Sequence, residues 1–279
     1  MYTRKKKTPF EREWEDLCRK EQHFLHKRQQ KKEPALNRML EQKVPPKLQQ
    51  TLELAFEKAF ALVFEKGTGM IEKTYPKDRL EKEYLINRYA DEIHANRRSL
   101  SVFSKKAQAT GRQNTALSGL SGIGMGALGI GIPDIPVFTA IALKCIYEIA
   151  VRYGFSYTDP EERYFILLLL EGAVSYGESL RQTDEKTEAF LRHPRLPEGY
   201  CSKQQIARTS AQFSKELLYL KFLQGIPLVG AVGGAYDMLY MNQISQYANL
   251  KYRKRFLLRY RQNHGFETAN PQTDTTTEG

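Results

Sequence analysis

The stretch GLSGIGMGALGIGIPDIP runs from Gly119 to Pro136. Its first thirteen residues hold six glycines, and no charged residue occurs before Asp134. The uncharged run covers residues 113–133, which is 21 residues, and about 20 apolar residues are needed to span a bilayer. Because glycine and serine dilute this run, we expect a helix or turn buried in a helical bundle. A membrane-inserted hairpin over residues 113–143 is the alternative.

The glycines in this stretch recur at helical spacing. A second uncharged run, residues 222–236, contains LQGIPLVGAVGGA and has glycines at similar spacing. Small residues on one helix face let two backbones approach closely, although each glycine costs about 1 kcal/mol of helix propensity relative to alanine. We therefore predict an all-α bundle with two central glycine-rich segments that pack on each other. The predicted helix-packing glycines are Gly122, Gly126, Gly129, Gly230 and Gly234.

Helix-start and helix-stop signals follow the first glycine-rich stretch. Asp134 is placed to cap a helix that begins at Ile135 and ends at Gly154 with a left-handed C-cap. Asp159 and Pro160 then begin another helix, and its wholly apolar run 165–170 predicts burial nearly all round. Further helical patterns cover residues 48–63, 77–106 and 210–222.

The N-terminal segment has the pattern of a basic amphipathic helix. Its apolar residues share one face, with Glu21 among them. We interpret it as a helix packed on the body, and binding to a membrane surface is the alternative. The predicted organisation is an N-terminal arm over residues 1–35, a helical domain over residues 36–265 and a disordered polar tail over residues 266–279.

Positive charge is concentrated near the two ends of the chain. The formal net charge is +11, and residues 251–261 (KYRKRFLLRYR) hold six basic residues and no acid. Such a segment attracts the phosphates of lipids or nucleic acids. The predicted residues for binding an anionic surface are Lys251, Arg253, Lys254, Arg255, Arg259 and Arg261.

The aromatic residues of the same segment argue against nucleic-acid binding. Tyr252, Phe256 and Tyr260 are four residues apart, which is the spacing of a helix-packing stripe. A stacking surface for bases would also interleave aromatic and basic residues, but the packing interpretation is favoured. We do not expect a nucleic-acid partner.

Signals for cofactors, metals and secretion are weak. The three cysteines, Cys18, Cys145 and Cys201, form no CxxC pair, and no HxxxH spacing occurs. The GxGxxG match at 124–129 is not preceded by a strand pattern, so it does not predict a nucleotide site. We expect no cofactor, no metal and no secretory signal, and therefore a cytoplasmic protein.

Acidic residues provide the alternative of an enzyme. Asp134, Glu171 and Asp237 are the candidate catalytic acids, with a structural role favoured for Glu171. Glu148 lies fourteen residues after Asp134, roughly 21 Å along a helix, so these two acids cannot form a catalytic pair. We expect Glu148 to pair with Arg152 instead.

Several segments resemble the EcsC family: GIPDIPVFTAIALKCIYEIAVRYGF (131–155), DPEERYFIL (159–167), IPLVGAVGGAYD (226–237) and YRKRFL (252–257). The resemblance extends roughly over residues 36–261 and implies an α-helical bacterial protein. The family is named for a protein encoded beside two subunits of an ABC transporter, and the resemblance implies no catalytic residues. We therefore expect a non-enzymatic accessory protein at the cytoplasmic membrane face, with an anionic membrane surface or a membrane transporter as its partner.

Overall fold

A computed structural model describes residues 7–30, 46–62, 64, 68–126, 134–224 and 230–265 of the 279-residue chain. Within these ranges the regular structure is helical and contains no strand, so the all-α prediction is confirmed. The helices are α1 (Pro9–Gln29), α3 (Pro46–Leu62), α4 (Thr68–Glu72), α5 (Lys77–Ile93), α6 (Arg97–Gly126), α7 (Asp134–Arg152), α8 (Pro160–Val174), α9 (Gly177–Arg192), α10 (Ser202–Gln224) and α11 (Gly230–His264).

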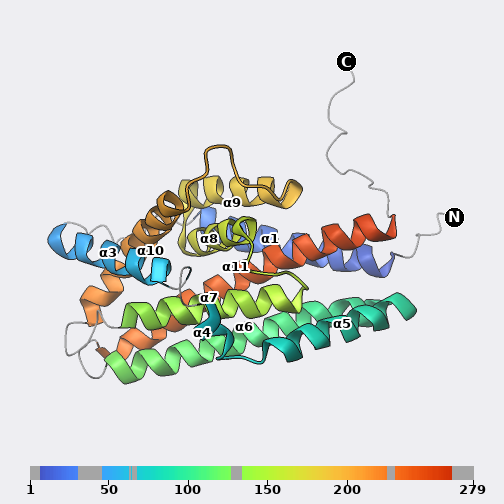
Figure 1. Cartoon of the computed structure of the whole chain (residues 1–279), viewed down its shortest axis with the longest axis horizontal. Coiled ribbons are helices and arrows are strands. Elements are labelled where there is room, and N and C mark those ends of the chain that lie inside the picture. The colour runs from blue at the N-terminus through green and yellow to red at the C-terminus, as the bar shows by residue number, and fades with distance from the viewer. Residues whose placement is uncertain are drawn as a thin grey trace, which may run out of the picture.

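The bundle is elongated, and its longest helices run along its length (Figure 1). Helix α6 runs antiparallel to α11, and these two helices form the most extensive helix–helix contact. Helix α7 packs on both, α8 packs on α11, and α3 and α10 pack on each other. The helical parts of the glycine-rich segments, at the end of α6 and the start of α11, therefore lie at one end of the bundle instead of at its centre.

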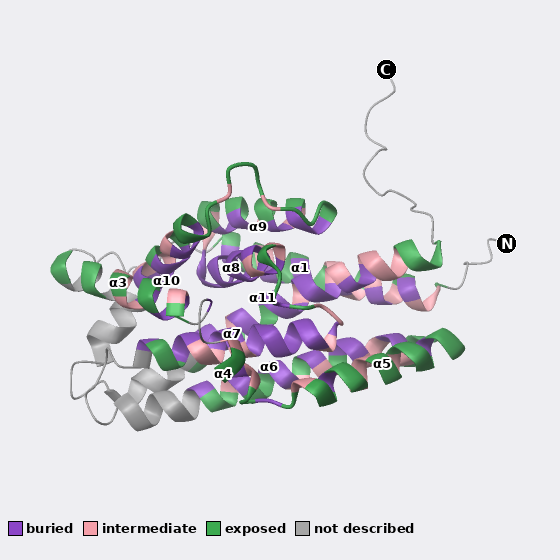
Figure 2. Cartoon of the chain, viewed as in Figure 1, coloured by how far each residue is buried: buried purple, intermediate pink, exposed green. Residues whose placement is uncertain are grey.

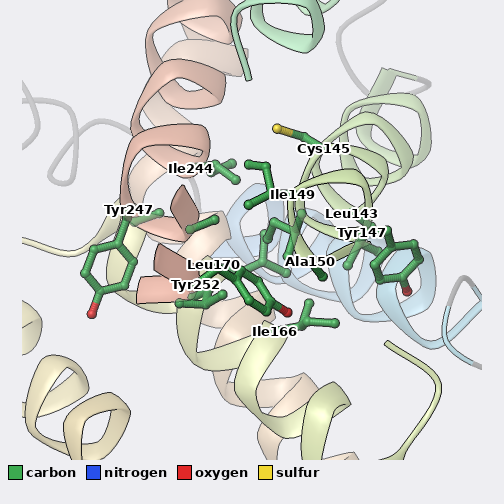
Figure 3. Close-up of a cluster of buried hydrophobic side chains, with 14 of the residues drawn as sticks. Leu143, Cys145, Tyr147, Ile149, Ala150, Ile166, Leu170, Ile244, Tyr247 and Tyr252 are labelled. Atoms are coloured by element: carbon green, nitrogen blue, oxygen red, sulfur yellow. The ribbon is translucent and has the colours of Figure 1, made fainter. Parts of the chain in front are cut away.

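The core lies where α7, α8 and α11 meet. Every residue of α8 from Tyr164 to Val174 is buried, which confirms the predicted all-round burial of this helix. Figure 2 shows α7 and α8 as the most continuously buried elements. In Figure 3, Ile149 of α7, Leu170 of α8 and Ile244 of α11 lie in one hydrophobic cluster.

The signals that end α7 and begin α8 act largely as predicted. Gly154 has φ +72°, and the N–H groups of Gly154 and Phe155 donate to the carbonyls of Val151 and Ala150 in a Schellman arrangement. Asp159 occupies the N-cap of α8, but its side chain makes no capping hydrogen bond. Asp134 is the first residue of α7, one residue earlier than predicted, and its side chain lies outside the description.

The single helical pattern over residues 77–106 corresponds to two helices. Helix α5 ends at Ile93, and α6 begins at Arg97. Asn96 causes the break, because its Oδ1 accepts hydrogen bonds from the N–H groups of Arg98 and Ser99 and so caps α6. A side chain that bonds to the backbone in this way competes with helix continuation.

Helices α6 and α11 approach closely at a glycine. A Cβ built on Gly111 would lie 1.8 Å from Ser245 Oγ and 3.1 Å from Ser245 Cβ. Gly122 lies eleven residues after Gly111, and Gly234 lies eleven residues before Ser245. Eleven residues are about three helical turns, so in an antiparallel pair these two glycines lie level and on the same faces. We therefore expect Gly122 and Gly234 to continue this close contact.

Some predictions fall on residues that are not described. The described ranges leave out residues 127–133, which include Gly129, and residues 225–229. They also leave out residues 31–45, which contain the predicted boundary between the arm and the domain, and the predicted tail 266–279. Those predictions stand untested. Over the described residues, no helix has both the length and the apolar character needed to cross a bilayer.

The Gly111 contact predicts the effect of one methyl group. Gly111→Ala forces a Cβ against Ser245 and should lower the free energy of unfolding by about 1–3 kcal/mol, despite the better helix propensity of alanine. Adding Ser245→Ala removes the hydroxyl and should restore part of the loss. Chemical denaturation followed by circular dichroism measures both.

Gly69→Ala is the matched control, because no atom lies within 4 Å of a Cβ built there. Its stability should equal or slightly exceed that of the wild type. A Gly111→Ala variant as stable as Gly69→Ala would contradict the close approach of α6 and α11.

Candidate interaction surfaces

The most basic segment, residues 251–261, is partly buried in the protein. Lys251 of α11 is fully buried (0% exposed). Its Nζ lies 2.6 Å from Glu21 Oε1 on α1, and 2.7 Å and 2.6 Å from Asp184 Oδ1 and Glu188 Oε1 on α9. A buried ammonium requires such partners, because its desolvation would otherwise cost several kcal/mol.

Neighbouring cations of α11 extend this pairing. Lys254 Nζ lies 2.8 Å from Glu21 Oε2 and 2.9 Å from Glu188 Oε1. Arg253 pairs with α1, at 2.6 Å from Glu13 Oε2 and 2.9 Å from Asp16 Oδ2. We call this set the ion-pair seam, and its members are Glu13, Asp16, Glu21, Asp184, Glu188, Lys251, Arg253 and Lys254.

The remaining cations of the segment also have intramolecular contacts. Arg255 pairs with Glu162 and stacks over Phe155 at 4.3 Å. Arg259 donates to the carbonyls of Tyr153 and Gly154 at the end of α7. Arg261 lies 5.8 Å from the ring centroid of Trp14.

These contacts argue against the predicted binding of an anionic surface by Lys251, Arg253, Lys254, Arg255 and Arg259, and the prediction for Arg261 stays untested. Lys251 and Arg253 are buried, and Lys254, Arg255 and Arg259 are directed at groups of the protein itself. The sequence could not reveal this, because most of the neutralising acids come from distant segments. The packing interpretation of the aromatic stripe is confirmed, since Tyr252 and Phe256 are buried and Tyr260 packs on the core.

Helix α1 packs on the body, as the favoured interpretation predicted. Phe10, Leu17 and Phe24 are buried, and the helix contacts α6, α9 and α11. Glu21, which interrupts the apolar face in the sequence, is the acid that meets Lys251. Thr8 and Glu11 form a capping box that fixes the start of the helix.

Electrostatics of the seam favour its charged form. Burial alone would lower the pKa of Lys251, but Tyr247 and the three carboxylates raise it well above its usual value. Burial would raise the pKa of Glu188, but Lys251 and Lys254 hold it below its usual value. Burial likewise opposes ionisation of Asp16, yet Lys20 and Arg253 lower its pKa to about 2.

Of the three candidate catalytic acids, the structure describes the side chain of Glu171. Glu171 is buried, and its carboxylate accepts hydrogen bonds of 3.2 Å from both Thr183 Oγ1 and Gln205 Nε2. This arrangement fits the structural role that was favoured for it. The side chains of Asp134 and Asp237 are outside the description.

The predicted pair of Glu148 with Arg152 is wrong. Glu148 accepts from Asn114 and lies 3.1 Å from Lys144 Nζ, whereas Arg152 reaches Glu83 of α5 at 3.3 Å. The reason is partly tertiary: α6 brings Asn114 to Glu148 and α5 brings Glu83 to Arg152, and within α7 Glu148 pairs with Lys144 in the preceding turn. Among the described residues, no cluster of His, Cys, Asp and Glu has the arrangement of a metal site.

Exposed apolar residues gather near the glycine-rich end of the bundle. The ends of α6 and α10 and the starts of α7 and α11 all lie at this end (Figure 1). Four described side chains next to the glycine-rich segments are exposed and apolar, namely Leu117 of α6, Val137 of α7, and Met238 and Leu239 of α11. We call these four residues, together with the described helical parts of the two uncharged runs, 113–126 and 230–236, the uncharged end.

A second apolar face lies on the outside of α5. Leu85, Ile86, Tyr89 and Ile93 are all more than half exposed. The helical pattern over residues 77–106 includes Leu85 and Ile93 but does not show which side of the helix is covered. The covered side carries Leu80, Tyr84 and charged residues, so α5 directs much of its apolar surface outward.

The ion-pair seam predicts a large effect of one substitution. Lys251→Ala leaves three acids near an empty buried position and should lower the free energy of unfolding by about 3–5 kcal/mol. Arg181→Ala is the control, because Arg181 is half exposed and pairs with Glu178 and Glu185 on the surface of α9. It should change stability far less than Lys251→Ala, because exposed ion pairs contribute little. Equal effects in urea denaturation would contradict the account.

The lowered pKa of Asp16 predicts acid sensitivity. Because this pKa falls from 3.8 to about 2 on folding, the stabilisation is present above pH 3.8 and is lost as the pH falls toward 2. The melting temperature of Asp16→Asn should therefore depend less on pH in this window than that of the wild type. Asp78→Asn, which replaces an exposed acid, should keep the pH dependence of the wild type. Parallel profiles for the wild type and Asp16→Asn would contradict the prediction.

Comparison with known proteins agrees with the resemblance seen in the sequence. The profile of the EcsC protein family matches residues 11–257. Protein EcsC of Bacillus subtilis is 26% identical over 162 residues, covering 57% of this chain and 66% of that protein. The uncharacterized protein YdbA of Bacillus subtilis is 26% identical over 170 residues, covering 57% of this chain and 60% of that protein.

The chain thus covers less than two thirds of the length of either relative. No solved structure matches it significantly. Since the family match extends over most of the helical body, from within α1 to the last turns of α11, the chain belongs to the EcsC protein family.

Proposed function

We propose that this protein is a non-enzymatic accessory protein that docks on the cytoplasmic face of a membrane through its uncharged end. The observation that carries the proposal is convergence: the described helical parts of two uncharged runs, residues 113–126 of α6 and 230–236 of α11, lie at the same end of the bundle. An extended apolar region of this kind on a globular protein marks an interaction site.

The described side chains at this end have the chemistry that a membrane interface accepts. Leu117 and Leu239 are each nearly half exposed, at 46% and 45%, and Met238 is exposed beside them. Apolar side chains on a peripheral protein enter the boundary between headgroups and acyl chains. Since no described helix is long and apolar enough to cross a bilayer, the proposal is for surface docking and not insertion.

The buried basic segment determines how this docking depends on lipid charge. The ion-pair seam neutralises the cations that would otherwise attract anionic lipid. Apolar burial at the uncharged end then supplies an affinity for neutral lipid, and this part of the binding is only weakly screened by salt. The proposed docking therefore does not require anionic lipid.

A membrane transporter is the protein partner that we propose alongside the lipid surface. Family membership supports this choice only through the genomic association for which the family is named. The enzyme alternative has less support, because the carboxylate of Glu171 is held by Thr183 and Gln205 within the fold.

Vesicle flotation tests the proposal. The full chain should float with neutral phosphatidylcholine vesicles, and high salt should leave that floated fraction largely unchanged. Leu117→Glu combined with Leu239→Glu should reduce that fraction by about tenfold or more, because two apolar groups are replaced by charges. Both positions are exposed, so the fold should be retained.

Met70→Glu is the matched control, because Met70 is an exposed apolar residue on α4, away from the uncharged end. This variant should float like the wild type. Recovery of the wild type in the soluble fraction with every vesicle composition would refute the proposal. Equal flotation of the double variant and the control would exclude the uncharged end as the docking surface.

A further inference from the structure

The outer face of α5 combines four large apolar side chains on one helix surface. The exposed fractions are 51% for Leu85, 67% for Ile86, 66% for Tyr89 and 54% for Ile93. Their spacing of one, three and four residues places them in one continuous stripe. Isolated exposed leucines need no explanation, but a stripe of this kind along a surface helix marks an interaction site.

The opposite face of α5 holds the helix firmly to the body. Leu80 is buried, and Glu83 lies 3.2 Å from Lys106 Nζ and 3.3 Å from Arg152 Nη1. Tyr84 accepts a hydrogen bond from Arg259, and the buried Asp91 accepts one from Ser99. Because these polar partners are used on the inner side, α5 cannot turn its apolar stripe inward without breaking them.

The stripe is symmetric about Tyr89. Leu85 lies four residues before Tyr89, and Ile93 lies four residues after it. A second α5 placed antiparallel and centred on Tyr89 would therefore set Leu85 opposite Ile93 of the other copy at both ends of the contact. Self-complementarity of this kind is what a two-fold symmetric interface requires.

Charge along the same helix is also compatible with self-association. The exposed charged residues of α5 include three basic residues and three acidic residues, namely Arg79, Lys82, Arg88, Asp78, Glu81 and Glu92. A surface that is neutral overall neither repels its own copy nor strongly attracts an anionic membrane.

Two of these charges border the stripe in a favourable register. Arg88 and Glu92 are exposed and lie on one flank, four residues apart, with Arg88 Nε 3.4 Å from Glu92 Oε1. In the antiparallel pair this flank meets the same flank of the second copy. Measured along the helix axis, Arg88 of one copy then lies about 3 Å from Glu92 of the other copy. The two-fold symmetry produces two such pairs of Arg88 with Glu92.

We propose that the outer face of α5 is a dimer interface in which α5 of a second copy of this chain packs antiparallel, centred on Tyr89. Helix α5 lies away from the uncharged end, so the proposal is independent of the proposed membrane docking. The four side chains form a small interface, and a dissociation constant in about the micromolar range is expected.

Sedimentation velocity of the full chain over about 1–100 μM tests the proposal in the range of weak interfaces. The wild type should shift from monomer to dimer as its concentration rises. Leu85→Glu combined with Ile93→Glu should abolish the dimer, and Met70→Glu should not. A wild type that is monomeric throughout the range, or a dimer that survives Leu85→Glu with Ile93→Glu, overturns the proposal.

Charge exchange tests the register and does not depend on the apolar variants folding. Arg88→Glu alone and Glu92→Arg alone should each weaken the dimer by on the order of tenfold, because attraction becomes repulsion at two symmetric contacts. The two substitutions together should restore it. Failure of this rescue overturns the antiparallel arrangement.

A cysteine placed at Tyr89 gives a direct readout of symmetry. In a Cys201→Ser background, which removes the exposed native thiol, Tyr89→Cys should form a disulfide-linked dimer on oxidation, and Met70→Cys should not. Vesicle binding that is lost with Leu85→Glu and Ile93→Glu while the chain sediments as a monomer would assign this face to lipid and overturn the proposal.

Discussion

The ammonium group of Lys251 is the point on which the arrangement of three helices depends. It lies fully buried on α11 and is neutralised by Glu21 of α1 and by Asp184 and Glu188 of α9. A charge at such a depth is tolerated only when oppositely charged groups surround it, so α1 and α9 cannot move away independently. Docking of the N-terminal helix is thus linked to the most basic segment of the sequence.

This pairing changes how the net charge of the protein should be understood. The formal charge of +11 is not changed by these pairs, but cations of the basic segment 251–261 are directed at groups of the protein itself. Two exposed apolar surfaces offer other sites for recognition: the uncharged end of the bundle and the outer face of α5. Both are well suited to contacts that depend little on ionic strength.

Local signals predicted the helices well, and tertiary contacts account for what they missed. Gly154 and the apolar run 165–170 determine a helix end and a buried helix from a few neighbouring residues. The partners of Lys251 lie up to 230 residues away along the chain, so no spacing rule reveals them. Periodicity placed Leu85 and Ile93 in one helical pattern, but which face of a helix is covered depends on the elements packed against it. The glycine-rich segments were recognised, yet their position at one end follows from the antiparallel course of α6 and α11.

Lysine reactivity measures the burial of Lys251 directly. Reductive methylation of the native protein, followed by mass spectrometry of its peptides, compares Lys251 with the exposed Lys186 and Lys203. Because it is buried, Lys251 should stay unmodified in the native protein while Lys186 and Lys203 react. All three lysines should react after unfolding in urea. Modification of native Lys251 at the rate of Lys203 would contradict the burial of the basic segment.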